Sequence, residues 1–161
     1  MPASEAPPRS DWRPAWATDW MEHVLKVPGR YDCLAQIAQF IEQTGAEAGL
    51  DTVAICRCQL AVDEACTNII EHGYQGEDLG PIEIACAAGT GELVITISDQ
   101  AKPFDAEAVP EPTLGESLEE LKIGGLGLYF MRQVMDTVEF SRANGGNKLV
   151  LVKRREPADS G

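Results

Sequence analysis

The stretch "AVDEACTNIIEHGY", residues 61–74, decides which fold to expect. At helical spacing it separates into an apolar and a polar face. The apolar face is typical of a helix packed on a core, and its members are Val62, Ala65, Cys66, Ile69, Ile70 and Gly73. The polar face carries Glu64, Asn68, Glu71 and His72. Asn is a poor helix former because its amide competes for backbone hydrogen bonds. Helix stability therefore does not explain Asn68.

Two interpretations of the polar face remain open on this helix alone. Glu64 and Asn68 are four residues apart and lie side by side on a helix surface. A carboxylate beside an amide oxygen offers the hard oxygen ligands that Mg²⁺ prefers. The carboxylate could instead accept a proton from a hydroxyl nucleophile. The plainer alternative is a solvated polar face without a chemical role.

The periodicity outside this stretch predicts strands and helices in a fixed order. A strand over 20–28 and a helix over 31–49 precede a helix that Asp51 caps and that runs to about 74. After it we expect strands over 80–88 and 92–99, a helix over 124–136, and strands over 137–143 and 148–155 around the turn "NGGN". This order predicts an α/β two-layer sandwich, with a mixed, mostly antiparallel sheet and helices on one face.

The termini and one long connection are predicted to lie outside the regular structure. Residues 1–17 are rich in proline and polar residues and are expected to form a flexible arm, while 18–155 form one domain and 156–161 a disordered tail. Trp12, Trp16 and Trp20 could dock the arm on the domain or on a second subunit. The segment 105–123 is acidic and contains prolines, which predicts a mobile lid.

Composition excludes several classes of function. The chain has 161 residues and a formal net charge of −13, which argues against nucleic acid or an anionic membrane as the main partner. It has no apolar run long enough to span a bilayer and no secretory signal at its start, so we expect a cytoplasmic protein. The five cysteines form no C-x-x-C pair and are expected to be mostly small buried side chains in a reducing compartment.

A second stretch with chemical potential is "ISDQAKPFD", residues 97–105. Asp99 lies where a strand ends, which is a rigid place from which to direct a carboxylate. A carboxylate there can accept a hydrogen bond from an exocyclic amine such as that of adenine. Phe104 could pack against the domain. The alternative is an ordinary turn, because Asp near Pro is common in turns.

The third stretch is "GGLGL", residues 124–128, directly before a helix. Glycines allow a ligand to approach the backbone, and a helix N-terminus presents unpaired N–H groups, a combination that suits phosphates. It is neither a Walker A loop nor the G-x-G-x-x-G of a dinucleotide-binding fold. A glycine-rich hinge is the alternative.

The combination of these stretches resembles a known family. A helix with E-x-x-x-N-x-x-x-H-G-Y, a strand ending in Asp, a long connection, Gly-Gly-x-Gly before a helix and a closing hairpin resemble the GHKL ATP-binding fold. Within it, "AVDEACTNIIEHGY", "SDQAKPFD", "GGLGLYFMRQVMD" and "GNKLVLVKR" are most similar to the anti-sigma-factor serine/threonine kinases of the RsbW and SpoIIAB type. The resemblance covers about residues 20–154.

The resemblance implies a role for each candidate residue. It implies that Asn68 holds Mg²⁺ against the phosphates of ATP, that Glu64 is the catalytic base, and that Asp99 binds the adenine amino group. The remaining implied nucleotide contacts are Ala101, Phe104, Gly124, Gly125, Leu126, Gly127 and Leu128, with Gly125 and Gly127 on the phosphate side. The family usually has D-x-G where this chain has Asp99-Gln100-Ala101. The added methyl of Ala101 is expected to weaken or reshape ATP binding.

The implied function is transfer of the ATP γ-phosphoryl group to Ser or Thr of a STAS-domain anti-anti-sigma protein. By the same resemblance the chain binds a sigma factor when that regulator is absent, and it could form a homodimer. One alternative is a non-catalytic module that binds nucleotide and a partner, which Ala101 favours and Glu64 opposes. The other is a histidine-kinase catalytic domain, which the H-G-Y ending does not favour.

Overall fold

The structure of the chain is a computed structural model that describes residues 20–105 and 125–156. The predicted arm, most of the predicted lid and tail, and Gly124 lie outside the described residues. The helices are α1 (Leu34–Glu47), α2 (Thr52–Asn68) and α3 (Gly125–Val134), with a 3₁₀ turn at Tyr31–Cys33 and a π-helical turn at Ile69–Gly73. The strands are β1 (Met21–Pro28), β2 (Pro81–Gly89), β3 (Glu92–Asp99), β4 (Thr137–Ala143) and β5 (Gly146–Arg154).

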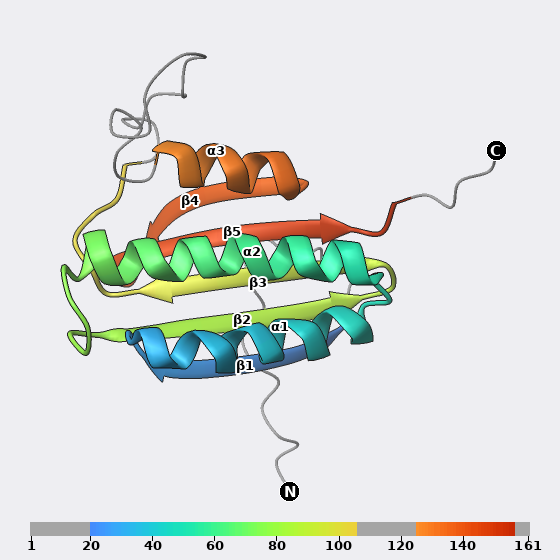
Figure 1. The fold of residues 1–161 in the computed structure, drawn as a ribbon, viewed down its shortest axis with the longest axis horizontal. Coiled ribbons are helices and arrows are strands. Elements are labelled where there is room, and N and C mark those ends of the chain that lie inside the picture. Colours follow the sequence, from blue (N-terminus) through green and yellow to red (C-terminus); the bar gives the residue numbers. More distant parts are fainter. Residues whose placement is uncertain (1–19, 106–124, 157–161) are drawn as a thin grey trace, which may run out of the picture.

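The five described strands form one sheet in the order β1-β2-β3-β5-β4. All three helices cover the same face of this sheet (Figure 1). The predicted two-layer α/β fold is therefore confirmed. The prediction allowed a mixed sheet, but every pairing among the described strands is antiparallel. β5 lies between β3 and β4, so the C-terminal hairpin joins the sheet next to the strand that ends in Asp99.

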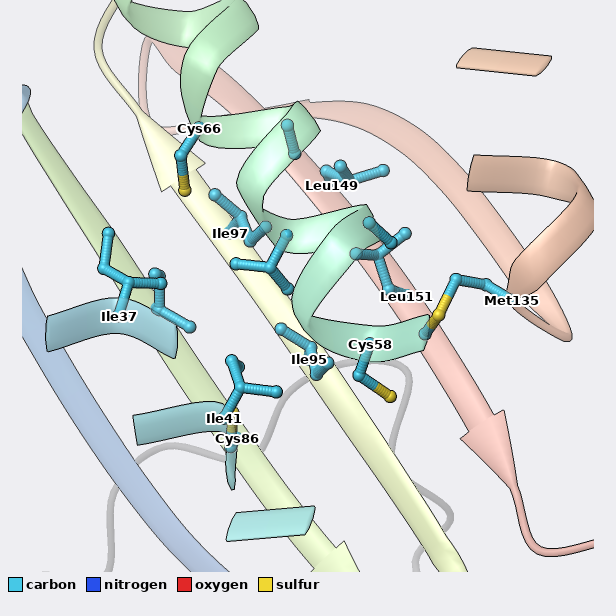
Figure 2. Packing of buried hydrophobic residues seen from close by; sticks show 14 of the residues in the cluster. Ile37, Ile41, Cys58, Cys66, Cys86, Ile95, Ile97, Met135, Leu149 and Leu151 are labelled. Atoms are coloured by element: carbon cyan, nitrogen blue, oxygen red, sulfur yellow. The ribbon is translucent and has the colours of Figure 1, made fainter. Parts of the chain in front are cut away.

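The core fills the space between the helices and the sheet. Alternate residues of the central strands point toward the helices, because successive side chains of a strand face opposite sides. Ile95, Ile97 and Leu151 lie there in contact range of the helix layer (Figure 2), and each has at most 1% of its surface exposed. The predicted burial of cysteines holds for three of the five, Cys58, Cys66 and Cys86. Burial raises the pKa of each of these thiols to about 12, so they remain protonated and unreactive.

The start of α2 follows the prediction, but its end does not. The Asp51 side chain accepts a hydrogen bond of 2.8 Å from the Ala54 amide and caps the helix. Regular α-helix was expected to continue to about residue 74. It ends at Asn68, and a π-helical turn follows, which the Tyr74 amide closes by donating to the Ile69 carbonyl at 2.7 Å. Such turns are rare and occur mostly at functional sites.

The hairpin between β4 and β5 has the predicted turn. Asn144 and Gly145 both have positive φ, 53° and 80°, as a two-residue turn of this kind requires. β5 begins at Gly146, two residues before the predicted strand. A side chain at Gly146 would collide with the carbonyl oxygen of Asp99, so glycine there allows the hairpin to approach the end of β3. The hairpin thereby becomes one wall of the candidate site.

Among residues 20–105 and 125–156, no helix is long and apolar enough to cross a bilayer.

Candidate nucleotide-binding site

A cavity of about 220 Å³ opens where α2, the loop after β3, α3 and the β4–β5 hairpin meet. Several predicted site residues from distant parts of the sequence share it, namely Asn68, Asp99, Phe104 and Leu128. Other lining side chains are mostly apolar and include Ile97, Met131 and Leu149. A concave, largely apolar pocket with a few polar groups is the usual form of a small-molecule site.

Asp99 is buried at the end of β3 and faces this cavity, with only 5% of its surface exposed. Its Oδ1 accepts hydrogen bonds from the Ala101 amide at 2.8 Å and from Asn147 Nδ2 at 3.0 Å. Within the described part of the chain, both donors reach the same oxygen. Oδ2 is therefore the atom left for a ligand, and as a carboxylate oxygen it can only accept a hydrogen bond.

Asn147 is a site residue that sequence reasoning missed. Its Nδ2 donates to the Lys102 carbonyl at 2.8 Å as well as to Asp99, and its Oδ1 accepts from the Phe104 amide at 2.9 Å. One side chain thus fixes the loop after β3 and the carboxylate at its start. The sequence shows Asn147 only as part of a turn signal. Its role depends on the pairing of Asp99 with Asn147 across β3 and β5, which joins positions 48 residues apart.

The methyl group of Ala101 lies away from the cavity. Ala101 is 7% exposed, and it does not line the pocket although its neighbours Asp99 and Lys102 do. A Cβ at Gly73 would come within 2.9 Å of the Ala101 methyl, so the two residues fit together only because position 73 lacks a side chain. The π-helical turn, which contains Gly73, thus provides the space for the Ala101 methyl group, and the expected effect on ATP binding stays a prediction.

Tyr74 also holds the loop after β3, through its hydroxyl group. Its hydroxyl donates to the Pro81 carbonyl at 2.6 Å and accepts from the Gln100 amide at 2.9 Å. A Cβ at Gly80 would lie 2.4 Å from the ring of Tyr74, so the chain passes directly against this side chain. The H-G-Y end of the helix therefore serves to position the loop that carries Asp99.

Glu64 and Asn68 lie together at the edge of the cavity. Asn68 lines it, whereas Glu64 does not; the carboxylate instead contacts Gly127 of α3 so closely that a side chain at Gly127 would collide with it. Burial is the main cause that raises the pKa of Glu64, and the charge of Asp63 raises it further. A hydrogen bond from the Asn68 amide acts in the opposite direction. A carboxylate with a raised pKa is a stronger base than a free glutamate, which suits a proton acceptor.

The π-helical turn separates two residues that the sequence had placed on one face. His72 lines the cavity, but Glu71 is turned outward and accepts a hydrogen bond of 2.9 Å from the hydroxyl of Tyr31. The predicted polar face therefore ends at Asn68 and resumes only with His72. Glu71 belongs to the contact between this turn and the 3₁₀ turn that precedes α1.

The predicted glycine-rich stretch begins α3. Gly125 and Leu126 form its first turn, and Leu128 is buried with 3% exposed and lines the cavity. Gly127 permits the approach of α3 to α2 described above. Phe104 lines the opposite wall, where its ring contacts that of Phe140 with centroids 4.9 Å apart. Gly124 lies outside the described residues.

The residues present fit a nucleotide better than a bare metal ion. Among the described residues, no group of three or more His, Cys, Asp or Glu side chains could hold a metal. Mg²⁺ is commonly bound by one or two protein ligands together with phosphate oxygens and water. Asn68 would be such a ligand, and the remaining ligands would come from a bound triphosphate. The buried acceptor Oδ2 of Asp99 fits an amino group at the other end of the same molecule.

Comparison with known proteins agrees with this geometry. Residues 27–153 match the family model described as histidine kinase-like ATPase domain. Serine-protein kinase RsbW of Bacillus pumilus is 30% identical over 143 residues, covering 84% of this chain and 88% of the relative. Serine-protein kinase RsbW of Bacillus subtilis is 28% identical over 131 residues, covering 79% and 81%.

Two solved structures share the fold. The structure of the RsbU and RsbW domains of Rv1364c from Mycobacterium tuberculosis aligns with a TM-score of 0.58 at 20% identity, over 83% of this chain and 32% of that one. This chain therefore spans about a third of that protein. The catalytic domain of histidine kinase ThkA aligns with a TM-score of 0.52 at 13% identity, over 84% and 99%.

The fold and the matched model define the class: the chain belongs to the histidine kinase-like ATPase domain family, whose fold the sequence had predicted. Within this family its relatives are the serine-protein kinases named RsbW. The predicted resemblance and the predicted enzyme class, a protein serine/threonine kinase, are thereby confirmed.

Proposed function

We propose that the chain uses ATP and Mg²⁺ to phosphorylate Ser or Thr of a STAS-domain anti-anti-sigma regulator, and that it binds a sigma factor when this regulator is unavailable. The proposal is supported by the relatives, which are serine-protein kinases named RsbW. The observation that carries it is the meeting of Asp99, Asn68 and α3 around one cavity, with Glu64 at its edge. The possible homodimer and the cytoplasmic location stay predictions.

Each polar group of the site has one task in this proposal. Asp99 Oδ2 accepts a hydrogen bond from the adenine amino group, while Asn147 and the Ala101 amide hold the carboxylate in place through Oδ1. Asn68 supplies an oxygen ligand to Mg²⁺. The bound Mg²⁺-ATP supplies the phosphoryl group and the charge neutralisation that its transfer needs. The backbone N–H groups at the start of α3 face the phosphates.

Glu64 is the proposed proton acceptor for the hydroxyl group of the substrate protein. It lies beside Gly127, in the first turn of α3, and one turn before Asn68 on α2. Its carboxylate is kept from full hydration by burial, which makes it a stronger base than a free glutamate. A purely nucleotide-binding protein would have no need of such a group.

The alternative of a non-catalytic binding module rested on Ala101, and this support is weak. The methyl group contacts Gly73 and does not enter the cavity. The kinase and the module differ in one measurable property, which is phosphate transfer to the partner.

The test compares variants of two neighbouring residues. Purified protein is mixed with a STAS-domain regulator from the same organism and labelled ATP, and phosphoserine or phosphothreonine is measured. Glu64→Ala should retain ATP binding and lose about 10²–10⁴-fold in transfer rate, the typical contribution of a general base. Asn68→Ala should weaken Mg²⁺-ATP binding as well, because it loses a metal ligand.

Glu71→Gln is the matched control, since this carboxylate lies on the next turn but is hydrogen-bonded to Tyr31 outside the cavity. It should transfer phosphate at nearly the unmutated rate. If the unmutated chain binds ATP and the regulator but transfers no phosphate, it is a binding module. If Glu64→Ala is as active as the unmutated chain, another group is the base.

A further inference from the structure

The sheet face that points away from the helices carries a buried apolar cluster, which we call the outer cluster. It consists of Ala87 of β2, Val94 of β3, and Val150 and Val152 of β5, with exposed fractions of 6%, 1%, 4% and 0%. The register places Ala87 opposite Val94 and Val94 opposite Val152, so the side chains form a continuous patch across three adjacent strands.

Valines on an uncovered sheet face would be partly exposed. Val24 of β1 gives the internal comparison, because it points to the same face outside the cluster and is 53% exposed. The three helices cannot cover the outer cluster, because they all lie on the other face (Figure 1). The burial is present in a single chain, so a second copy is not needed to account for it.

Trp20 indicates which part of the chain provides the cover. It is the first described residue, and it packs against the outer cluster. Its ring lies over Gly89, where an added Cβ would be 2.5 Å from it. The side chain of Trp20 therefore lies on the outer face. Nineteen residues precede it in the sequence.

The spacing of the tryptophans fits this face. Trp12, Trp16 and Trp20 recur every four residues. In an extended chain, side chains that are an even number of residues apart point to the same side. Four extended residues span ~13 Å, while three adjacent strands span ~10 Å from first to last. One such step from Trp20 therefore spans the cluster, and the segment is long enough for Trp16 and Trp12 both to lie over it.

We propose that residues 1–19 lie across the outer face of their own sheet and that Trp12 and Trp16 cover the outer cluster. The partner of this surface is the N-terminal segment of the same chain. This assigns a role to the tryptophan-rich segment that the proposed kinase activity does not use, and it is independent of that activity.

The first test uses the full chain with one tryptophan at a time. Trp12→Phe with Trp20→Phe leaves Trp16 as the single emitter, and Trp16→Phe with Trp20→Phe leaves Trp12. Each remaining tryptophan should emit at a shorter wavelength than N-acetyltryptophanamide in the same buffer. Each should also show a several-fold lower acrylamide quenching constant. Both properties should be independent of protein concentration while sedimentation shows a monomer.

The second test replaces residues on the outer face of the sheet. Ala87→Glu places a carboxylate inside the outer cluster, and Val24→Glu places the same group on the same face outside it. In the single-Trp16 background, Ala87→Glu should shift the emission to longer wavelength, and Val24→Glu should leave it unchanged. Circular dichroism and ATP binding check that both variants are folded. If Ala87→Glu does not fold, Trp12→Ser with Trp16→Ser should instead increase binding of the apolar dye ANS by the otherwise unmutated chain.

Three results would overturn the proposal. Tryptophans that are quenched as fast as the free indole would mean that the segment is not docked. Protection that appears only at concentrations where dimers form would mean that a second copy covers the face. Equal responses to Ala87→Glu and Val24→Glu, or an unchanged dye signal in the double serine variant, would mean that the segment lies elsewhere.

Discussion

Asp63 and Glu64 are neighbours on α2 whose negative charges repel each other. Burial raises the pKa of Glu64, and Asp63 is the second cause of the rise. A general base acts only when ionised, so phosphate transfer should fall as the pH drops through this raised pKa. Asp63→Asn removes one cause and should move the acidic limb of the rate profile to lower pH.

The measurement is the transfer rate as a function of pH at saturating ATP. Asp63 is exposed, so its replacement by the amide leaves the core intact. Glu42→Gln, an exposed position on α1, makes the same change in net charge and should not move the limb. A limb that moves equally in both variants would show that the titrating group is not Glu64.

Gly73 and Ala101 form a second residue-scale pair, because the methyl of one occupies the space left by the other. Gly73→Ala should destabilise the protein by about 1–3 kcal/mol, the usual effect of overpacking, and should weaken ATP binding. Ala101→Gly should be tolerated alone, and it should rescue Gly73→Ala when the two are combined. Denaturant unfolding of the four proteins gives the coupling free energy.

Additive effects of these two substitutions would contradict the pairing.

The departure from the D-x-G pattern has a conformational reason as well. Ala101 is absent from the described residues with positive φ, which are Gln75, Asp78 and Asn144 outside the glycines. The backbone at position 101 therefore does not require glycine.

The sequence was most informative for residues whose partners are local. Asp99 at a strand end and the pair Glu64 and Asn68 were found from spacing within one element. Asn147 was missed because its partners, Asp99 and Lys102, lie more than forty residues earlier and meet it only through the β3–β5 pairing. The sequence predicted a contact between Ala101 and the nucleotide, but Ala101 does not line the cavity. The direction of its methyl group cannot be deduced from the sequence.

At the scale of elements, α3 is attached at its C-terminal end by a buried lysine. Lys153 of β5 is 5% exposed. Its Nζ donates a hydrogen bond of 3.0 Å to the carbonyl of Val134, which is the last residue of the helix. Asp136 lies 3.9 Å from the same ammonium group. A cation is favourable at a helix C-terminus, where carbonyl groups lack partners.

Lys153→Met should loosen α3 while leaving β1 and β2 unchanged. The substitution leaves the Val134 carbonyl without its donor, which costs about 1–3 kcal/mol in a buried position. Hydrogen exchange should therefore become faster along α3. Arg154→Met is the control, because that side chain is half exposed and points to the opposite face of the sheet. Equal exchange in both variants would show that Lys153 does not anchor the helix.

Element boundaries were predictable where a local signal marks them. The Asp51 cap and the Asn144–Gly145 turn are such signals, and both occur as expected. The π-helical turn has no comparable signal, because it arises from tertiary contacts: Tyr74 is held by Pro81 and Gln100, and Glu71 by Tyr31. The helix widens in this turn, and this places His72, not Glu71, in the cavity.

For the whole molecule, the two-layer class followed from the order of elements, whereas the strand order did not. The position of β5 between β3 and β4 is a non-local pairing. The sequence pattern of an inner strand does not specify its neighbours. The resemblance supplied what periodicity could not, since the same motifs occur in a family with one common arrangement.

Nucleotide binding should be visible as stabilisation of the whole molecule. A ligand that binds only the folded chain adds about 2.7 kcal/mol at 100-fold above its dissociation constant, which corresponds to roughly 5–10 °C in Tm. ATP with Mg²⁺ should raise Tm by this amount, and GTP by much less. Guanine presents a carbonyl oxygen where adenine has an amino group, and it would face the acceptor Oδ2 of Asp99.

Asp99→Asn tests the same hydrogen bond to adenine by changing the protein instead of the nucleotide. An asparagine oxygen can still accept from the Ala101 amide and from Asn147, so the loop keeps both hydrogen bonds to Oδ1. The other atom becomes a donor and repels the adenine amino group. The variant should melt near the unmutated temperature without nucleotide and lose the rise with ATP. Glu139→Gln, an exposed change on β4, should keep the rise. A full ATP-dependent rise in Asp99→Asn would mean that adenine is not bound through this carboxylate.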